Sequence, residues 1–480
     1  MTTPFRAWGY LFWGVEMIQD AFEKSDGAPF ELYAPDNRYV YVSNPEQIKE
    51  IDAAPDSVLS LQTASKQMLQ PVYTMRGFNW FDLRGTEGFG LLRAVRTVLT
   101  SNLPKILPDL SGVIKVHFDE MHSKHPTVGG SRHSPLFAMV TKLVVISNAT
   151  SFFGEDVGQN EEFLVQALRF IEETLIGAEI VRLFPVWVAP LVGAVLNLWL
   201  KAHITVFNTL VPVAEQRCNE RDLKKIGQNV PIHADCIQWV MEAAPRNKPW
   251  PAPRIIHELM ALWFGSIHAL STTICFAIHD LCLHPEYVDP IRKELQANYA
   301  EFKRTGHGLP LLDSFLKESA RLTPVESMAT RRSALQPFTL SDGTRVHIGN
   351  WVCTPVKSIM QDSRFYPNPL QFYGFRFVDP NIVEGTVNRQ EGGTQFAPSP
   401  QPTQSNFTDL NQTFHFWGTG RCACPGRFYA VSVMKLIIGQ MILNYDCELV
   451  DKEAPRSFNW RSSTFPRRST KVVFTPISRD

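Results

Sequence analysis

The segment whose residue types and spacing most clearly indicate chemistry is a glycine-rich loop with two cysteines, FWGTGRCACPGRF at 416–428. Its glycines leave room for a flat ligand against the backbone, and Cys424 stands directly before Pro425. Because proline suits the first helical position, we predict that Pro425 opens an apolar helix, Phe428–Leu443. The N–H groups and dipole at that helix end favour a thiolate, and a thiolate held by N–H donors suits a single axial ligand to haem iron.

Simpler interpretations of the two cysteines have to be weighed. Cys422 and Cys424 could form half of a zinc site, but no second pair of Cys or His lies at a matching spacing. A disulfide across one residue would be badly strained. The loop alone leaves open a third interpretation, a buried and inert cysteine in a turn.

Two segments upstream of the loop carry charged residues at defined spacings. Glu318 and Arg321 lie three residues apart in FLKESARLTP, so on a helix they share one face and can pair. Arg376 stands in FYGFRF, shortly after the segment YPNP at 366–369. The alternative to a structural role is an ordinary surface ion pair, worth less than about 1 kcal/mol.

The loop and these two segments together resemble the cytochrome P-450 family. The pattern W-G-x-G-x-x-x-C-x-G at 417–426 is similar to the family's haem loop, with Trp417 where Phe is usual. The upstream pair matches its Glu-x-x-Arg, and the resemblance implies a structural triad of Glu318, Arg321 and Arg376. The resemblance covers roughly residue 30 to the C-terminus. The wording of the motifs is most similar to that of fungal secondary-metabolism members of the family.

The resemblance also implies which residues bind haem (heme b). Cys424 would be the metal ligand, and Arg331 matches a position that binds a haem propionate in relatives. Arg93 and Arg96, in GLLRAVRTVLT, are further candidates, with a solvated helix face as the alternative. The predicted cofactor-binding set is Cys424, Arg331, Arg96, Trp417, Gly418 and Gly426.

One departure from the family pattern lies inside the loop. The position two before the ligand, usually Arg or His, is Cys422, so an expected propionate donor is missing. Arg421 or His415 could replace it.

A second departure lies in the central helix, where the family's Ala/Gly-Gly-x-Asp/Glu-Thr segment aligns with GSIHAL, beginning at Gly265. His268 replaces the usual acid and Ala269 the usual alcohol, so the proton route to bound O₂ must change. We predict catalytic roles for His268, because neutral imidazole can relay protons near pH 7, and for Ser271, reaching in across a distorted helix turn. The alternatives are a satisfied core histidine, a hydroxyl on the substrate, or water alone.

The elements that must position these residues are mostly helices. Residues 1–28 contain an amphipathic helix that is too polar to span a bilayer, so any membrane anchor would be absent from this chain. The remaining predicted elements are a strand pair at 30–33 and 39–43, mostly helical segments over 47–295, a long apolar helix at 257–283 and a hairpin at 338–348.

Two other stretches stand out by composition. Leu183–Leu200 has no charged residue, but Pro185 and Pro190 interrupt it, which favours an interfacial or buried segment over a membrane span. Residues 380–413 are polar and rich in Pro, Gly and Gln, which predicts a long loop or insertion.

Charge and cysteine usage exclude several classes of protein. Lys+Arg 47 equals Asp+Glu 47 in the 480 residues, which excludes a basic nucleic-acid-binding tail and a disordered acidic chain. The 8 cysteines show no framework spacing, which indicates reduced thiols.

These observations predict a mainly α protein with a large helical lobe, a small β-rich lobe and haem between them, as a single catalytic domain over 1–480. The resemblance implies a haem-thiolate monooxygenase that oxidises an apolar secondary metabolite, of terpenoid or prenylated-indole type, with O₂ and NADPH-derived electrons. Its expected partners are an NADPH-cytochrome reductase, the small-molecule substrate and a membrane surface, without nucleic acid. The expected location is the cytoplasmic face of the endoplasmic reticulum, otherwise the cytoplasm. Ala269 keeps an alternative open, a haem-thiolate enzyme that does not insert oxygen.

Overall fold

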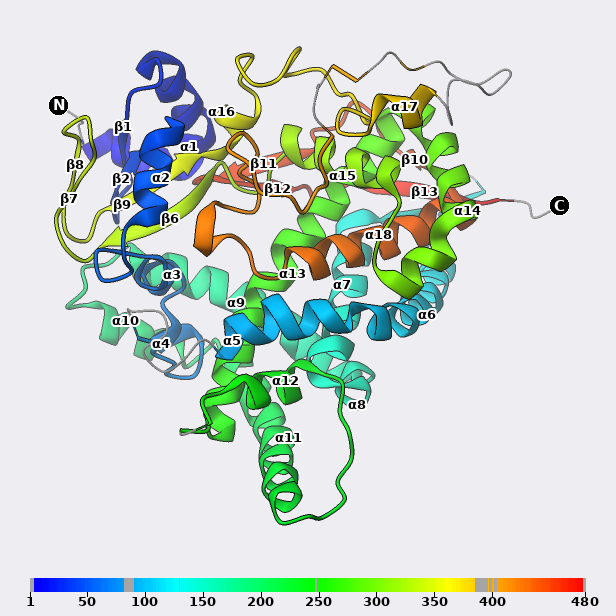
Figure 1. The fold of residues 1–480 in the computed structure, drawn as a ribbon, viewed down its shortest axis with the longest axis horizontal. Coiled ribbons are helices and arrows are strands. Elements are labelled where there is room, and N and C mark those ends of the chain that lie inside the picture. The colour runs from blue at the N-terminus through cyan, green and yellow to red at the C-terminus, as the bar shows by residue number, and fades with distance from the viewer. Residues whose placement is uncertain are drawn as a thin grey trace.

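The computed structural model describes residues 4–81, 90–128, 130–246, 248–384, 396, 399–400 and 404–477. Most of these residues are helical, which confirms the predicted mainly α fold class. Figure 1 shows a helical part, and a smaller part in which the blue N-terminal segment lies beside yellow strands. The larger helices are α1 (Pro4–Ser25), α2 (Pro45–Ala53), α3 (Leu61–Leu69), α6 (Thr100–Lys124), α7 (Leu136–Phe153), α9 (Glu161–Arg182), α10 (Ala189–Leu196), α11 (Ala202–Lys225), α12 (Cys236–Ala243), α13 (Ala252–Leu283), α14 (Val288–Thr305), α15 (Pro310–Leu322) and α18 (Arg427–Asn444).

Short helical turns connect these helices. They are α4 (Pro71–Thr74), α5 (Gly90–Arg93), the π-helix η1 (Ala94–Leu99), α8 (Glu155–Gly158), η2 (Pro285–Tyr287), α16 (Val356–Met360), α17 (Pro380–Ile382) and η4 (Gly420–Cys422).

The strands form four small sheets. A five-stranded sheet has the order β1 (Phe30–Tyr33), β2 (Arg38–Tyr41), β9 (Trp351–Pro355), β6 (Met328–Ala334), β3 (Leu59–Ser60). A four-stranded sheet has the order β10 (Tyr445–Leu449), β13 (Lys471–Pro476), β5 (Ser131–Pro135), β4 (Thr127–Val128). Two hairpins pair β7 (Phe338–Thr339) with β8 (Arg345–Val346), and β11 (Ser457–Trp460) with β12 (Ser463–Pro466).

The long central helix is the axis of the helical part. α13 begins at Ala252, five residues before the predicted start, and ends at the predicted Leu283. Its apolar side chains pack against α7, α9, α11, α15 and α18, and the indole N–H of Trp263 donates to the carbonyl of Ala167 in α9 at 3.0 Å. Burial of apolar surface on several faces fixes α13 in the middle of the core.

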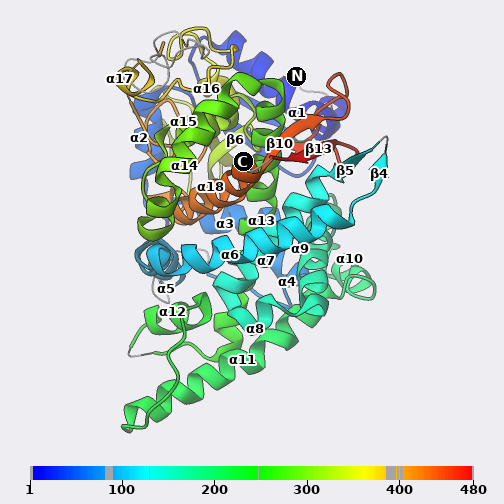
Figure 2. The ribbon, with the colours of Figure 1, turned by 90° about the vertical axis from the view of Figure 1, so that its right-hand side faces the viewer.

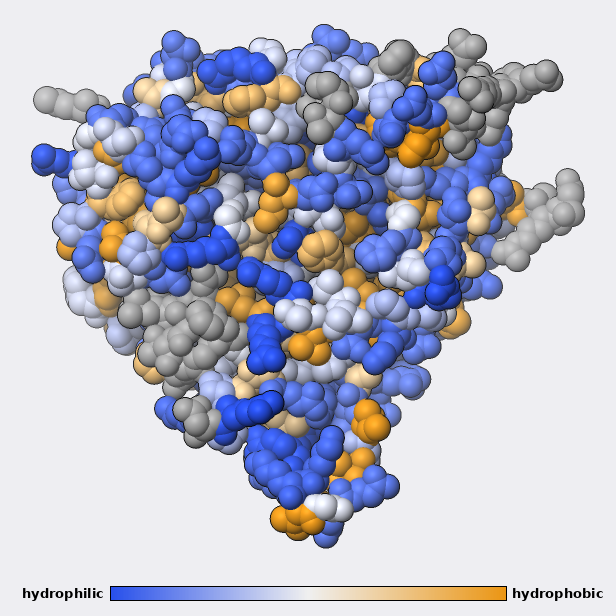
Figure 3. Space-filling model, viewed as in Figure 1, coloured by the Kyte–Doolittle hydropathy of each residue, from blue (hydrophilic) through white to orange (hydrophobic). Residues whose placement is uncertain are grey.

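Among the described helices, α7 and α13 are long and apolar enough to cross a membrane by length and composition, but most of the apolar part of each is buried inside the protein. Core helices pass the same test, so this finding is weak evidence for a span. On the face shown in Figure 3, hydrophilic side chains predominate and apolar ones are scattered among them.

The charge-free stretch at 183–200 is neither a membrane span nor a core helix. It forms a turn followed by α10, and most of its large apolar side chains are exposed, with Trp187 84% and Trp199 76% accessible. Figures 1 and 2 place α10 at the outer edge of the molecule, beyond α4 and α9. Of the predicted loop at 380–413, residues 385–395, 397–398 and 401–403 lie outside the described part of the chain.

Candidate active site

The glycine-rich loop forms a tight turn beside the five-stranded sheet and leads into α18, drawn in orange in Figure 1. The N–H of Cys424 donates to the carbonyl of Trp417 at 2.8 Å, which closes the loop. Gly420 has φ +55, and a Cβ at this position would lie 2.5 Å from the carboxyl carbon of Asp52. The close approach and the left-handed backbone both require glycine here.

The thiol of Cys424 lies where backbone donors reach it. Burial raises its pKa above the usual value for a cysteine, while hydrogen bonds from the N–H groups of Gly426 and Arg427 and the charges of Arg427 and Arg96 act in the opposite direction. α18 begins at Arg427 with Gly426 as its N-cap, so Pro425 precedes the cap instead of occupying the first helical position. The N–H donors that the sequence predicts are therefore present, although the helix begins two residues after Pro425.

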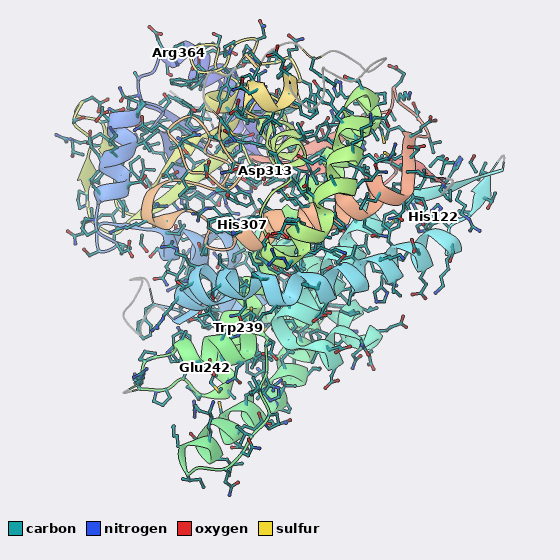
Figure 4. The ribbon with its side chains drawn as sticks, turned by 45° about the vertical axis from the view of Figure 1, so that its right-hand side comes forward. His122, Trp239, Glu242, His307, Asp313 and Arg364 are labelled. Carbon is teal, nitrogen blue, oxygen red and sulfur yellow. The ribbon has the colours of Figure 1, made fainter. Side chains whose placement is uncertain are left out.

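Trp417 is fixed by the segment that precedes the loop. Its indole N–H donates to the carbonyl of Phe407 at 2.7 Å, and its ring contacts those of Phe407 and Phe416. The Phe407 N–H in turn donates to Asp313 of α15 at 2.6 Å, and Asp313 pairs with Lys435 of α18 at 2.7 Å. Asp313 lies near the centre of the molecule in Figure 4. The end of the polar segment 380–413 is thus part of the support of the loop.

The three charged residues of the predicted triad form one buried network. Arg321 donates to both carboxylate oxygens of Glu318, at 2.7 and 2.9 Å, and Arg376 Nε lies 3.0 Å from the same carboxylate. Further N–H groups of the two arginines donate to the carbonyls of Met360, Pro367 and Pro369. All three side chains are at most 1% exposed, so this network is not an ordinary surface ion pair.

The predicted propionate donors lie on different elements, Arg331 on β6 and Arg96 on η1. Arg331 pairs with Glu326, and its buried Nε–H has no hydrogen-bond partner among the described residues. Arg96 is exposed and donates to the carbonyl of Arg421 at 3.1 Å, while Arg93 is also exposed. Arg331 and Arg96 therefore keep donor capacity that an anion can use.

The two suggested replacements for the missing donor at Cys422 differ in their contacts. Arg421 pairs with Asp56 at 2.9 Å and also donates to the carbonyl of Ala54. His415 is fully buried, its Nε2 lies 3.0 Å from the carbonyl of Gln412, and burial lowers its pKa to about 4. A neutral His415 bound to backbone supplies no positive charge to an anion.

A large cavity of about 1110 Å³ lies against one face of α13. Gly265, His268, Ala269 and Thr272 line it, together with residues of α9, β6 and the β11–β12 hairpin. A Cβ at Gly265 would have no atom within 4 Å, so the glycine does open space at the helix surface. The lining is mostly apolar, as a pocket for an apolar ligand requires.

The hydroxyl nearest to His268 is that of Thr272, one helical turn away. Thr272 Oγ1 lies 3.3 Å from His268 Nδ1, and burial lowers the pKa of His268, which keeps the imidazole neutral. Ser271 is fully buried, does not line the cavity, and its hydroxyl has no partner among the described residues. α13 is continuous here, and Thr273 donates to the carbonyl of Ala269 at 2.8 Å as in an ordinary helix, so Ser271 is not carried to the cavity by a distorted turn.

Several polar residues of the cavity, among them Thr272 and Glu326, have no role predicted from the sequence. Thr272 could have been found, because residues four apart on a helix share a face and His268 was already a candidate. Glu326 has no comparable local signal, because its backbone is paired with the distant β11–β12 hairpin.

Comparison with known proteins identifies the family. The family model described as Cytochrome P450 matches residues 2–474. The cytochrome P450 monooxygenase AN1598 of Emericella nidulans is 27% identical over 465 residues, covering 95% of this chain and 82% of that protein. Cytochrome P450 monooxygenase janQ of Penicillium janthinellum is 25% identical, covering 95% of this chain and 88% of that protein. The solved structure of retinoic acid bound cyanobacterial CYP120A1 has the same fold, with a TM-score of 0.69 at 16% identity over 98% of this chain and 97% of that one.

The chain therefore belongs to the cytochrome P450 family of haem-thiolate oxidoreductases, which confirms the family, the fold and the enzyme class predicted from the sequence.

The residues present fit a haem. A half-buried thiol with two N–H donors can ligate iron, and the orphaned Nε–H of Arg331 and the exposed Arg96 can bind propionates. The Trp417 carbonyl accepts the N–H of Cys424, Gly418 has the left-handed backbone of the turn, and Gly426 is the N-cap of α18.

Proposed function

We propose that this chain is a monooxygenase that oxidises an apolar secondary metabolite, of terpenoid or prenylated-indole type, with O₂ and electrons from NADPH through a reductase. The observation that carries the proposal is the mostly apolar cavity along the Gly265–Thr272 face of α13, in a chain whose half-buried Cys424 thiol bears N–H donors. A mostly apolar lining suits an apolar substrate.

Haem, held by Cys424, would supply the oxygen-activating chemistry. The chain supplies the surroundings. Gly418 and Gly426 let the backbone approach the ligand, Arg331 and Arg96 bind its carboxylates, and the apolar wall of the cavity excludes water and orients the substrate.

His268 and Thr272 are the chain's own groups for holding a proton on the cavity side. Ala269 has no hydroxyl, so the usual donor at that position is absent. His268 Nδ1 and Thr272 Oγ1 lie 3.3 Å apart, so the imidazole and the hydroxyl can exchange a proton. Thr272 lies one helical turn after His268 on the same face of α13. We assign this role to His268 with Thr272, and not to Ser271.

Isotope labelling tests the reaction. The chain and a reductase are expressed together, a panel of terpenoids and prenylated indoles is supplied with NADPH, and products are compared by mass spectrometry under ¹⁶O₂ and ¹⁸O₂. We expect a product that carries one atom from O₂ and that requires NADPH and the reductase. A product formed without the reductase and without the label would instead identify an isomerase, dehydratase or coupling enzyme.

The exposed apolar segment 184–199 supports the membrane surface as a partner, at the cytoplasmic face of the endoplasmic reticulum. It follows α9, which also lines the cavity, so a substrate dissolved in the lipid would enter beside it. The double substitution of Trp187 and Val188 by Asp should weaken binding to phosphatidylcholine vesicles without lowering the thermal unfolding midpoint. Unchanged vesicle binding would contradict this placement.

A further inference from the structure

Glu326 is an acidic residue that lines the cavity and takes no part in the ion pairs that α9 makes. Its side chain is 34% accessible, and it lines the cavity in a wall that is otherwise mostly apolar. A carboxylate in such surroundings is costly unless its oxygens have partners. Its partners therefore indicate what the carboxylate still lacks.

The hydrogen bonds to Glu326 leave acceptor capacity on its carboxylate. Oε2 accepts from Arg331 Nη2 and from Ser462 Oγ at 3.1 Å, and Oε1 accepts from Ser463 Oγ. A carboxylate offers about four acceptor positions, so one position on Oε1 has no donor among these groups. Because Arg331 balances the negative charge, a neutral donor suits this position better than a second cation.

The backbone on both sides of Glu326 is held in place. The N–H of Ser327 donates to the carbonyl of Ser462 at 2.7 Å, and the N–H of Thr464 donates to the carbonyl of Val325 at 3.0 Å. These bonds join the start of β6 to the turn and second strand of the β11–β12 hairpin. The carboxylate is thus presented by rigid backbone and not by a mobile loop.

The same hairpin connects Glu326 to the proposed proton-holding pair. Two residues after Ser463, the ring of Phe465 lies 5.1 Å from the imidazole of His268, centroid to centroid. Glu326, His268 and Thr272 therefore face one cavity, with apolar side chains such as Phe264 lining the space around them. A ligand that fills this cavity meets the carboxylate and the α13 face together.

We infer that Glu326 is the polar anchor of the cavity and that the substrate is an apolar molecule with a neutral hydrogen-bond donor, a hydroxyl or an N–H, which Oε1 accepts. This inference rests on the proposed function, since it names the substrate class of the same site. Glu326 is then a specificity-determining residue that fixes which end of the substrate faces α13.

Matched pairs of ligands test the inference on the haem-loaded enzyme. Farnesol is compared with farnesyl methyl ether, and 3-prenylindole with its 1-methyl derivative, by equilibrium dialysis. The wild type should bind the donor member of at least one pair about tenfold more tightly, because a hydrogen bond to a charged acceptor is lost in the other member. Glu326→Ala should bind the two members equally, and Glu326→Gln, which keeps an acceptor oxygen, should retain part of the preference.

The control is Glu301→Ala, which removes an exposed carboxylate on α14 that pairs with Arg304, and neither of these residues lines the cavity. It should leave the preference unchanged, and haem content and the thermal midpoint are measured for every variant. If Glu326→Ala does not fold, Glu326→Gln decides, and a preference equal to that of the wild type overturns the anchor.

Binding and turnover separate the two proposals. A wild type that does not prefer the donor member of either pair, including one that binds neither member, overturns the inference. If it nevertheless forms labelled product from either member, the proposed function stands without the anchor. A preference that Glu326→Ala abolishes, with no NADPH-dependent product, supports the anchor and counts against the monooxygenase.

Discussion

The two sides of the active site differ in how completely their polar groups are paired. On the loop side, Glu318, Arg321 and Arg376 are buried, and the two arginines share one carboxylate and several backbone carbonyls. On the cavity side, Glu326 keeps an open acceptor position, and the buried Nε–H of Arg331 has no partner among the described residues. The first arrangement holds a fixed geometry, and the second leaves groups for molecules that the chain itself does not contain.

The largest effect is expected where the pairing is complete. Glu318→Leu leaves two buried guanidinium groups without a counter-charge and should lower the free energy of unfolding by about 3–5 kcal/mol. The urea unfolding midpoint measures this loss.

The matched control is Glu301→Leu, which breaks a pair with Arg304 at the same i, i+3 spacing on an exposed helix face. That change should cost less than about 1 kcal/mol. Equal effects of the two substitutions would contradict the difference between the two sides.

We expect a pH-dependent contribution to the free energy of unfolding from the start of α15, the helix that carries Glu318. Glu294 accepts the N–H groups of Leu311 and Leu312 at 2.8 and 3.0 Å, and burial raises its pKa to about 7. Between the ordinary pKa of 4.5 and 7, the folded state binds the proton more tightly than the unfolded state, so this contribution is present at low pH and is lost as the pH rises.

Glu294→Gln should remove that pH dependence. From pH 4.5 to 7.5 the wild type should lose about 3 kcal/mol of stability relative to the variant, measured as the difference between their urea midpoints. Parallel pH profiles of the two proteins would show that Glu294 is ionised in the folded state throughout.

The smallest effect is expected on the cavity side. Thr272→Val removes the hydroxyl beside His268 while keeping the shape of the side chain, and it should lower the product formed per NADPH consumed by a few-fold, with more peroxide released. Ser271→Ala is the control, because Ser271 lies outside the cavity, and it should leave this ratio unchanged. A larger loss from Ser271→Ala than from Thr272→Val would overturn the assignment of the proton-holding pair.

The loop side could be predicted from the sequence because its geometry is local. Glu318 and Arg321 lie within one helical turn, and Cys424 stands beside the N–H groups of the next helix, so spacing alone implies their contacts. α18 begins at Arg427, one residue before the predicted Phe428, and Pro425 is not its first residue because Gly426 is the N-cap.

The cavity side could be predicted only in part, because its geometry depends on distant segments. The sequence predicts His268 from its place on α13. It proposes Ser271 as the second residue, whereas Thr272 lines the cavity, because i and i+4 positions share a helix face. Arg331 lies in a β-bulge of β6, where Thr330 has φ +52, and no local sequence pattern predicts that bulge. The position of Glu326 depends on the β11–β12 hairpin, more than 130 residues away in the sequence.

The identity of the iron ligand is the central claim, and the carbon monoxide spectrum of the reduced protein tests it most directly. Cys424 bears the N–H donors of Gly426 and Arg427, whereas Cys422 belongs to the short helical turn η4 before it. Cys422→Ala should therefore keep the thiolate-type ferrous–CO band, and Cys424→Ala should lose it at comparable haem content. Loss of the band in Cys422→Ala with retention in Cys424→Ala would contradict the account.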